Sequence, residues 1–203
     1  MALKKILPIF SYVLHPVFIP TIGCVLYLGY SGALFTIQEK LYVLFQAVVL
    51  TVCIPILVFF VLKMLGKVDS IMVYEAAQRK IPLLLHCFLI LLLVKKTIVI
   101  DRYPELHFFL LGGLLSSLIA LVLLFLNIKA SLHLLAISAL TVFISGLSMH
   151  LQLQNTLLVA MLILLNGLVA SSRLIMNAHT YKELVIGFAV GTVPQLFLLF
   201  LWL

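Results

Sequence analysis

The sequence predicts an all-α, polytopic transmembrane helix bundle with six to seven spanning helices, built as a single domain over residues 1–203. Hydrophobic residues make up 65% of the chain and charged residues only 9%, and the mean hydropathy is +1.33. A soluble domain of this length cannot bury so much apolar surface, so the bilayer is the expected solvent. The apolar residues also form continuous runs that do not alternate with polar ones, which disfavours a β-barrel.

Seven apolar runs, separated by short polar connections, define the expected spans. They lie at roughly 9–30, 42–65, 82–100, 108–126, 131–153, 156–171 and 184–203. The first run contains His15-Pro16 and Pro20, which predict a kink or a break between an interfacial piece and the span proper. We expect His15 to be an interfacial packing residue, and the remaining histidines outside the motifs to be structural or interfacial: His86, His107 and His150.

The net charge of +7 points to an anionic partner. The chain has no basic, aromatic-interleaved soluble surface, so we expect no nucleic acid, and membrane lipids or an anionic substrate are the expected partners. Cys24, Cys53 and Cys87 lie in apolar runs without paired spacing. They are interpreted as small buried hydrophobic residues, and neither as metal ligands nor as a disulfide framework.

Counting the crossings assigns the polar connections to the two membrane surfaces. With seven spans, the N-terminus, the interval 66–80, the connection 129–133 and the stretch 172–183 all fall on one surface. We therefore expect the polar side chains of these segments to meet there. The candidate site residues are Arg79, Lys80, Lys129, Ser131, His133, Arg173, His179 and Glu183.

The stretch 172–183 reads S-R-L-I-M-N-A-H-T-Y-K-E and directly follows a spanning run. Ionisable groups at bilayer depth are costly and are rarely present without a function. If the stretch is helical, His179 and Glu183 fall on one face, one turn apart. The carboxylate would then hold one imidazole nitrogen and leave the other free for chemistry. The planar guanidinium of Arg173 suits a phosphate group.

This stretch resembles the third signature of the type 2 phosphatidic acid phosphatase superfamily. That signature is serine-arginine, five residues, histidine, three residues and an acid; the acid is aspartate in the family and Glu183 here. Ser131-Leu132-His133 resembles the second signature, proline-serine-glycine-histidine, with Ala130 in place of the proline and Leu132 in place of the glycine. A second interpretation of Ser131 is that it only caps a helix.

The segment from Arg79 to Pro82 resembles the end of the family's first signature. That signature is a lysine, six further residues and then arginine-proline. Met72 stands where the family has lysine, and two residues separate the arginine from the proline. Lys67, Lys80 or Lys129 could supply the missing cation. A basic loop that binds anionic headgroups is the alternative interpretation of this segment.

The resemblance implies an integral-membrane phosphatase that hydrolyses lipid phosphates or diphosphates. It implies that His179 is the nucleophile and forms a phospho-histidine, that Glu183 orients it, and that His133 protonates the leaving oxygen. The phosphate would be held by Arg173, Ser131, Arg79, Lys80 and Lys129. No carboxylate cluster suited to magnesium lies on this face, so we expect a metal-independent reaction without a cofactor.

Two other functions stay open. A catalytically degenerate family member could bind an anionic lipid or a membrane partner protein, which the substitutions at Met72 and Leu132 favour. A small transporter is ranked last, because its charged residues or broken helices would be expected at mid-membrane.

The expected location is the bacterial inner membrane. Most basic residues lie on the motif surface, which by the positive-inside rule is cytoplasmic. However, the function could itself require many of these charges. The resemblance places the active face on the periplasmic side.

Overall fold

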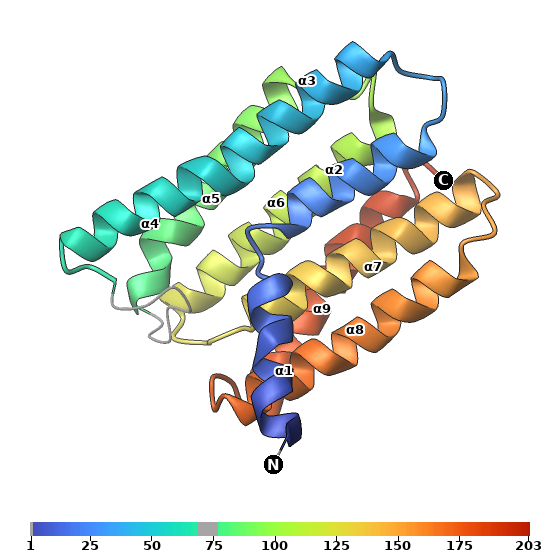
Figure 1. Ribbon diagram of the computed structural model, residues 1–203. Coiled ribbons are helices and arrows are strands. Elements are labelled where there is room, and N and C mark those ends of the chain that lie inside the picture. Colours follow the sequence, from blue (N-terminus) through green and yellow to red (C-terminus); the bar gives the residue numbers. More distant parts are fainter. Residues whose placement is uncertain (1, 69–76) are drawn as a thin grey trace.

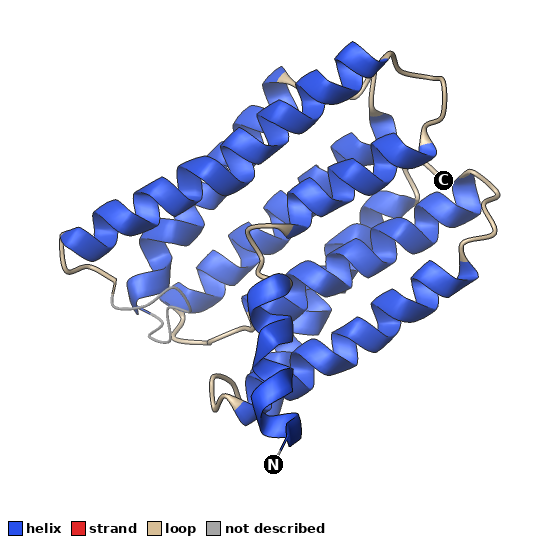
Figure 2. Cartoon of the chain, in the orientation of Figure 1, coloured by secondary structure: helices blue, strands red, loops and turns tan. Residues whose placement is uncertain are grey.

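The computed structural model describes residues 2–68 and 77–203, and every regular element in these residues is a helix (Figures 1 and 2). A π-helical segment, Val49–Cys53, joins α3 (Ile37–Val48) to α4 (Ile54–Met64), so that Ile37–Met64 forms one long helix. Met72, at the position of the family lysine, lies outside the described residues. The helices are α1 (Ala2–Val13), α2 (Ile19–Tyr30), α3 (Ile37–Val48), α4 (Ile54–Met64), α5 (Lys80–Lys96), α6 (Pro104–Phe125), α7 (Leu132–His150), α8 (Thr156–Ile175) and α9 (Tyr181–Leu199), with a 3₁₀ turn at Ala77–Arg79 before α5.

Within residues 2–68 and 77–203, five helices are long and apolar enough to cross a membrane: Ile37–Met64, α6, α7, α8 and α9. This is the architecture of a multi-pass membrane protein, as the hydropathy predicted. The count is smaller than the predicted six to seven, because α2 has only 12 residues and α5 has 17. A helix rises about 1.5 Å per residue, so both are shorter than the hydrocarbon core of a typical bilayer.

The first apolar run is divided into two helices. α1 ends at Val13, His15 and Pro16 lie in the connection, and α2 begins at Ile19 with Pro20 in its first turn. Proline is tolerated there because the first helical N–H groups have no partner inside the helix. α1 packs against α8 and lies across one end of the bundle, at an angle to the other helices (Figure 1). The break that the prolines predicted brings His15 to this end.

Three helices end on this same side of the bundle with a residue in the left-handed region. The terminators are Gly66 after α4 (φ 66°), Asn127 after α6 (φ 60°) and Asn177 after α8 (φ 50°). At Asn177, the next N–H, that of Ala178, donates to the Arg173 carbonyl at 3.0 Å, which closes the last turn of α8. The chain then reverses within a few residues, so the start of α9 returns to the end of α8.

α7 lies at the centre of the fold, packed against α2, α6, α8 and α9 (Figure 1). Phe143 of α7 stacks on Phe109 of α6 with ring centroids 4.4 Å apart. Gly187 allows α9 to approach the start of α7, because a Cβ there would lie 2.5 Å from the Ser131 carbonyl oxygen. This close packing fixes the start of α9 beside the start of α7.

Candidate functional site

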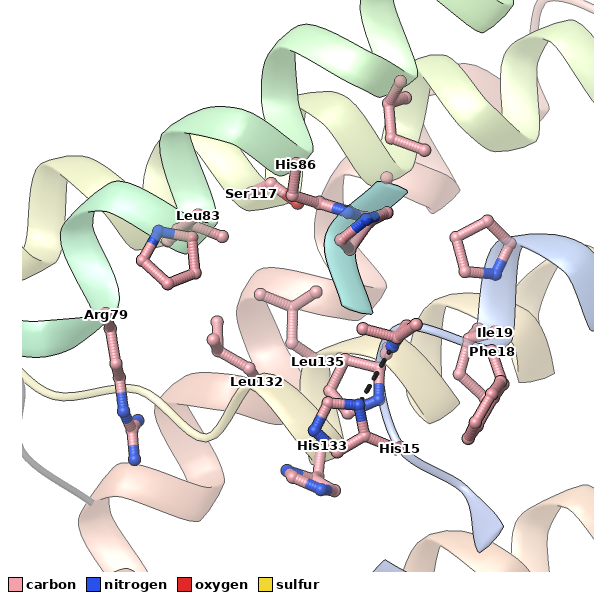
Figure 3. A pocket seen from close by; sticks show the side chains of 18 of the residues that line it. His15, Phe18, Ile19, Arg79, Leu83, His86, Ser117, Leu132, His133 and Leu135 are labelled. Carbon is pink, nitrogen blue, oxygen red and sulfur yellow. Dashed lines mark hydrogen bonds between the residues drawn. The ribbon is translucent and has the colours of Figure 1, made fainter. Parts of the chain in front are cut away.

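A cavity of about 430 Å³ opens among α2, α4, α5, α6 and α7. Most of its wall is apolar, with side chains such as Phe59, Leu83 and Ile90. Its polar end lies at the side of the bundle where α5 and α7 begin and α8 ends (Figures 1 and 3). The polar side chains at that end are His15, Arg79, His133, Arg173 and His179.

His179 and Glu183 form the contact that the spacing predicted, but by a different geometry. The stretch is not one helix: α8 ends at Ile175, and His179 lies in the connection before Thr180, the N-cap of α9. Glu183 is the third residue of α9, and its Oε2 accepts from His179 Nδ1 at 2.8 Å and from the Thr180 backbone N–H at 3.2 Å. The second bond is half of a capping box. The carboxylate thus reaches back over the start of the helix to the imidazole. Glutamate is one methylene longer than aspartate, which favours it for this reach.

This contact fixes the tautomer of His179. A carboxylate only accepts, so Nδ1 carries the proton and Nε2 keeps its lone pair. The His179 side chain is 1% exposed. Burial, and then the positive charges of Arg79, Arg173 and Lys129, hold the pKa of His179 well below its ordinary value. His179 is therefore a neutral imidazole at pH 7, with one nitrogen available as a nucleophile.

Among the residues that the structure describes, three cations and one carboxylate act on His179: Arg79, Arg173, Lys129 and Glu183. Arg173, in the last turn of α8, is 0% exposed, and Arg79 is also buried. Burial and the charge of Arg173 lower the pKa of Arg79 to about 10, against the opposing effect of Glu183. Lys129 Nζ donates to the Ala178 carbonyl at 3.1 Å. Burial, followed by the charge of Arg79, lowers the Lys129 pKa. Cations that disfavour one another in this way favour an anion between them.

His133 lines the cavity from the first turn of α7 and is held by α1. Its Nε2 lies 3.1 Å from the Ser11 carbonyl oxygen, which can only accept, so Nε2 carries a proton and Nδ1 is the nitrogen left available. The Ser11 hydroxyl also lies 2.6 Å from that of Ser172, the residue before Arg173. His15 stands edge-on to His133 with ring centroids 5.1 Å apart (Figure 3). α1 and its connection to α2 therefore form part of the site.

The sequence did not assign Ser11 or His15 to this site. The break at His15-Pro16 was the available signal, since a chain interrupted at the surface can contribute side chains to a site there. His86, which we expected to be structural or interfacial, also lines the cavity. By contrast, His107 binds the Ile98 carbonyl at 2.7 Å, and His150 lies 3.4 Å from Glu105, both away from the cavity.

Two of the predicted phosphate ligands, Ser131 and Lys80, do not line the cavity. Ser131 is fully buried and caps α7: its Oγ accepts from Leu134 N–H at 3.5 Å, and its own N–H donates to the Glu183 carbonyl at 3.1 Å. It does not line the cavity, whereas Leu132 does. Lys80 is not brought into the site, because its Nζ lies 4.7 Å from the centre of the Phe125 ring and the cavity wall does not include it.

The part of the chain that the structure describes contains no group of three or more His, Cys, Asp or Glu side chains placed to hold a metal ion. The charged groups around His179 are instead suited to an anion. Arg79, Arg173 and Lys129 surround a neutral imidazole whose free nitrogen can attack an electrophilic centre.

No family model, curated protein or solved structure matches this chain.

Proposed function

We propose that the protein is an integral-membrane phosphatase that hydrolyses a lipid phosphate or diphosphate through a phospho-histidine at His179. One observation carries this proposal: an apolar cavity, walled by helices of a membrane bundle, ends at a cluster of buried cations with an oriented neutral histidine. The cavity suits an acyl or prenyl chain, and the cluster suits the phosphate. The resemblance of segments 131–133 and 172–183 to the phosphatase signatures supports the same function.

The chemistry follows from the two histidines. The lone pair of His179 Nε2 forms a bond to phosphorus while the bond from phosphorus to the lipid oxygen breaks. Arg79 and Arg173 stabilise the negative charge on the phosphoryl oxygens, and Glu183 stabilises the imidazole as it becomes cationic. His133 already carries a proton on Nε2, bonded to the Ser11 carbonyl, so its Nδ1 takes the proton of a substrate phosphate bound as its monoanion and passes it to the leaving oxygen. It then accepts a proton from the water that attacks phosphorus and releases inorganic phosphate.

A second candidate function is lipid phosphate binding without turnover. Leu132 favours it, because it lines the cavity beside His133 where the phosphatase signature has glycine. A side chain there narrows the approach of a phosphate to the N-terminus of α7, a site that otherwise attracts anions. The arrangement of His179 and Glu183 favours hydrolysis, because binding alone does not require an oriented imidazole.

Release of inorganic phosphate by the purified protein distinguishes these functions. We expect release from at least one member of a panel containing diacylglycerol phosphate, lysolipid phosphate, and prenyl phosphate and diphosphate. The matched control is His179→Gln, which we expect to bind the same lipid without releasing phosphate. Binding of a lipid phosphate with no release by the unaltered protein would instead support the second function.

The active surface is proposed to face the periplasm of a bacterial inner membrane. Accessibility of a single cysteine placed at Asn177, in a variant lacking Cys24, Cys53 and Cys87, tests this in intact cells. Labelling by a membrane-impermeant thiol reagent is expected, and protection until the cells are opened would place the site in the cytoplasm.

A further inference from the structure

The face of α1 that points away from the bundle is apolar. Leu7 and Ser11 lie one turn apart on the opposite face and are buried. The exposed side chains of this helix, each more than half accessible, are Ile6, Ile9, Tyr12 and Val13. Residues 6–13, the part of α1 whose side chains the structure describes, include no charged residue. Water is therefore a poor solvent for the outward face.

The position of α1 indicates what covers this face. The helix has 12 residues and is about 18 Å long, which is too short to cross a bilayer. It packs against α8 and lies at an angle across the end of the spanning helices (Figure 1). A short helix with an apolar outward face in this position suits the membrane interface, where its side chains enter the layer between headgroups and acyl chains. Tyr12 also suits this depth, at which tyrosine is enriched.

The inner face of α1 contacts the proposed general acid. Ser11 lies in the last turn of the helix, where backbone carbonyls lose their N–H partners within the helix. His133 Nε2–H donates to the Ser11 carbonyl at 3.1 Å. The Ser11 hydroxyl lies 2.6 Å from that of Ser172, which precedes Arg173. α1 is thus joined both to His133 and to the end of α8 that carries Arg173.

The bond to Ser11 matters most when His133 carries two protons. Once Nδ1 takes a proton from the substrate, the imidazole is a cation that is still bonded to α1 through Nε2. The C-terminal end of a helix has a partial negative charge, which stabilises a cation bonded there. If α1 left the bundle, the buried imidazole would lose this acceptor, and its cationic form would be disfavoured.

We propose that α1 is an interfacial helix, and that its binding to the bilayer surface holds His133 in the form that protonates the leaving oxygen. The partner is the lipid surface itself. Ser11 is then a positioning residue, because it acts through His133. The role of His133 rests on the proposed phosphatase function, whereas the location of α1 does not depend on it.

Fluorescence quenching tests the location of α1 without any need for turnover. Trp202 is the only tryptophan of the chain, so Trp202→Phe combined with Ile9→Trp gives a single reporter on the outward face. The full-length variant is placed in phosphatidylcholine nanodiscs whose lipids are brominated on the upper acyl carbons. We expect strong quenching relative to unbrominated lipid, and little quenching by aqueous iodide.

Two substrates test whether α1 acts on the proton donor. One is an alkyl phosphate, whose alkoxide must be protonated as it leaves. The other is a nitrophenyl phosphate with the same alkyl chain, whose phenolate leaves without a proton. Release of the leaving group in a single turnover isolates the step in which His133 acts as an acid. In nanodiscs, Ile6→Ser with Ile9→Ser should slow this step about 10- to 100-fold for the alkyl phosphate, a part of what a general acid contributes, and leave the nitrophenyl phosphate unaffected.

Met64→Ser with Leu65→Ser is the matched control. These two side chains are also exposed and apolar, lie at the end of α4 on the same side of the bundle, and are not in the cavity wall. The control should keep the rates of both substrates. Thermal unfolding in nanodiscs checks that each variant is folded.

The outcomes separate this inference from the proposed function. Quenching by iodide and not by brominated lipid would overturn the interfacial location. An equal loss with both substrates, or no loss with either, would overturn the action of α1 on His133. If the unaltered protein cleaves neither substrate, the proposed hydrolysis fails and the action on His133 fails with it, while the quenching result still decides where α1 lies.

Discussion

Replacing Glu183 by glutamine tests how His179 is held. The Glu183 carboxylate accepts from His179 Nδ1 at 2.8 Å, which leaves the Nε2 lone pair directed away from it. Glutamine can donate from its amide to Nδ1, which would move the proton to Nε2 and remove the nucleophile. In serine proteases the corresponding change costs about 10⁴-fold in rate, and we expect a loss approaching that size.

The same substitution has only a small expected effect on folding. Glu183 also accepts from the Thr180 backbone N–H at 3.2 Å, and loss of one capping interaction costs about 1 kcal/mol. Thr180→Ala is therefore the matched control. It removes the Thr180 Oγ that accepts from Glu183 N–H at 3.4 Å but leaves the bond between carboxylate and imidazole in place. It should lose similar stability and keep most of its activity.

The assay is the initial rate of phosphate release from a lipid phosphate, with thermal unfolding measured on the same samples. Glu183→Asp should keep a measurable part of the activity, because it retains the carboxylate but shortens its reach to His179 by one methylene. Near-normal release by Glu183→Gln would refute this account. Glu183 would then be only a helix cap, and the binding function would be favoured.

Three further predictions concern the cations and the reaction. Vanadate should inhibit phosphate release, because it mimics five-coordinate phosphorus. Arg173→Ala should no longer be inhibited by vanadate, and its turnover rate should fall by at least about 10²-fold. A variant that keeps both the inhibition and the turnover rate would show that Arg173 is structural. Phosphate release should continue in the presence of EDTA. If EDTA abolishes release and added magnesium restores it, the histidine mechanism is contradicted. Because the pKa of His179 is lowered, kcat/KM should stay high below the ordinary titration range of histidine. Arg79→Met removes one charge that lowers this pKa, so the acidic limb of the pH profile of kcat/KM should move to higher pH. An unchanged acidic limb would show that Arg79 does not influence the pKa of His179.

The helical fold and the shared surface could be predicted because both follow from hydropathy. Long apolar runs specify helices in a bilayer. The shared surface was inferred from seven crossings. Although α2 and α5 are shorter than a typical span, both run along the bundle beside the longer helices (Figure 1), and Arg79, His133, Arg173 and His179 all line one end of the cavity. The composition of an apolar run does not reveal how much of it forms one helix, and α2 occupies only 12 residues of the first run.

The details of the site depend on local backbone geometry that the spacing did not reveal. The contact between His179 and Glu183 arises at a helix start, because Asn177 ends α8 before the histidine. Lys80 follows Arg79 in sequence, but the turn of the helix directs it to Phe125 instead of the cavity. His86 had a readable signal, since residues seven apart share a helix face with little rotation.

Hydrolysis by this route requires that His179 becomes covalently phosphorylated. The most direct measurement is rapid quenching of the purified protein with a lipid phosphate radiolabelled at phosphorus, followed by identification of the labelled residue. We expect an acid-labile, base-stable phosphoenzyme with the label on His179, absent from His179→Gln and accumulating when His133→Ala slows hydrolysis of the intermediate. Phosphate release at a normal rate from His179→Gln, or label on any other residue, would contradict it.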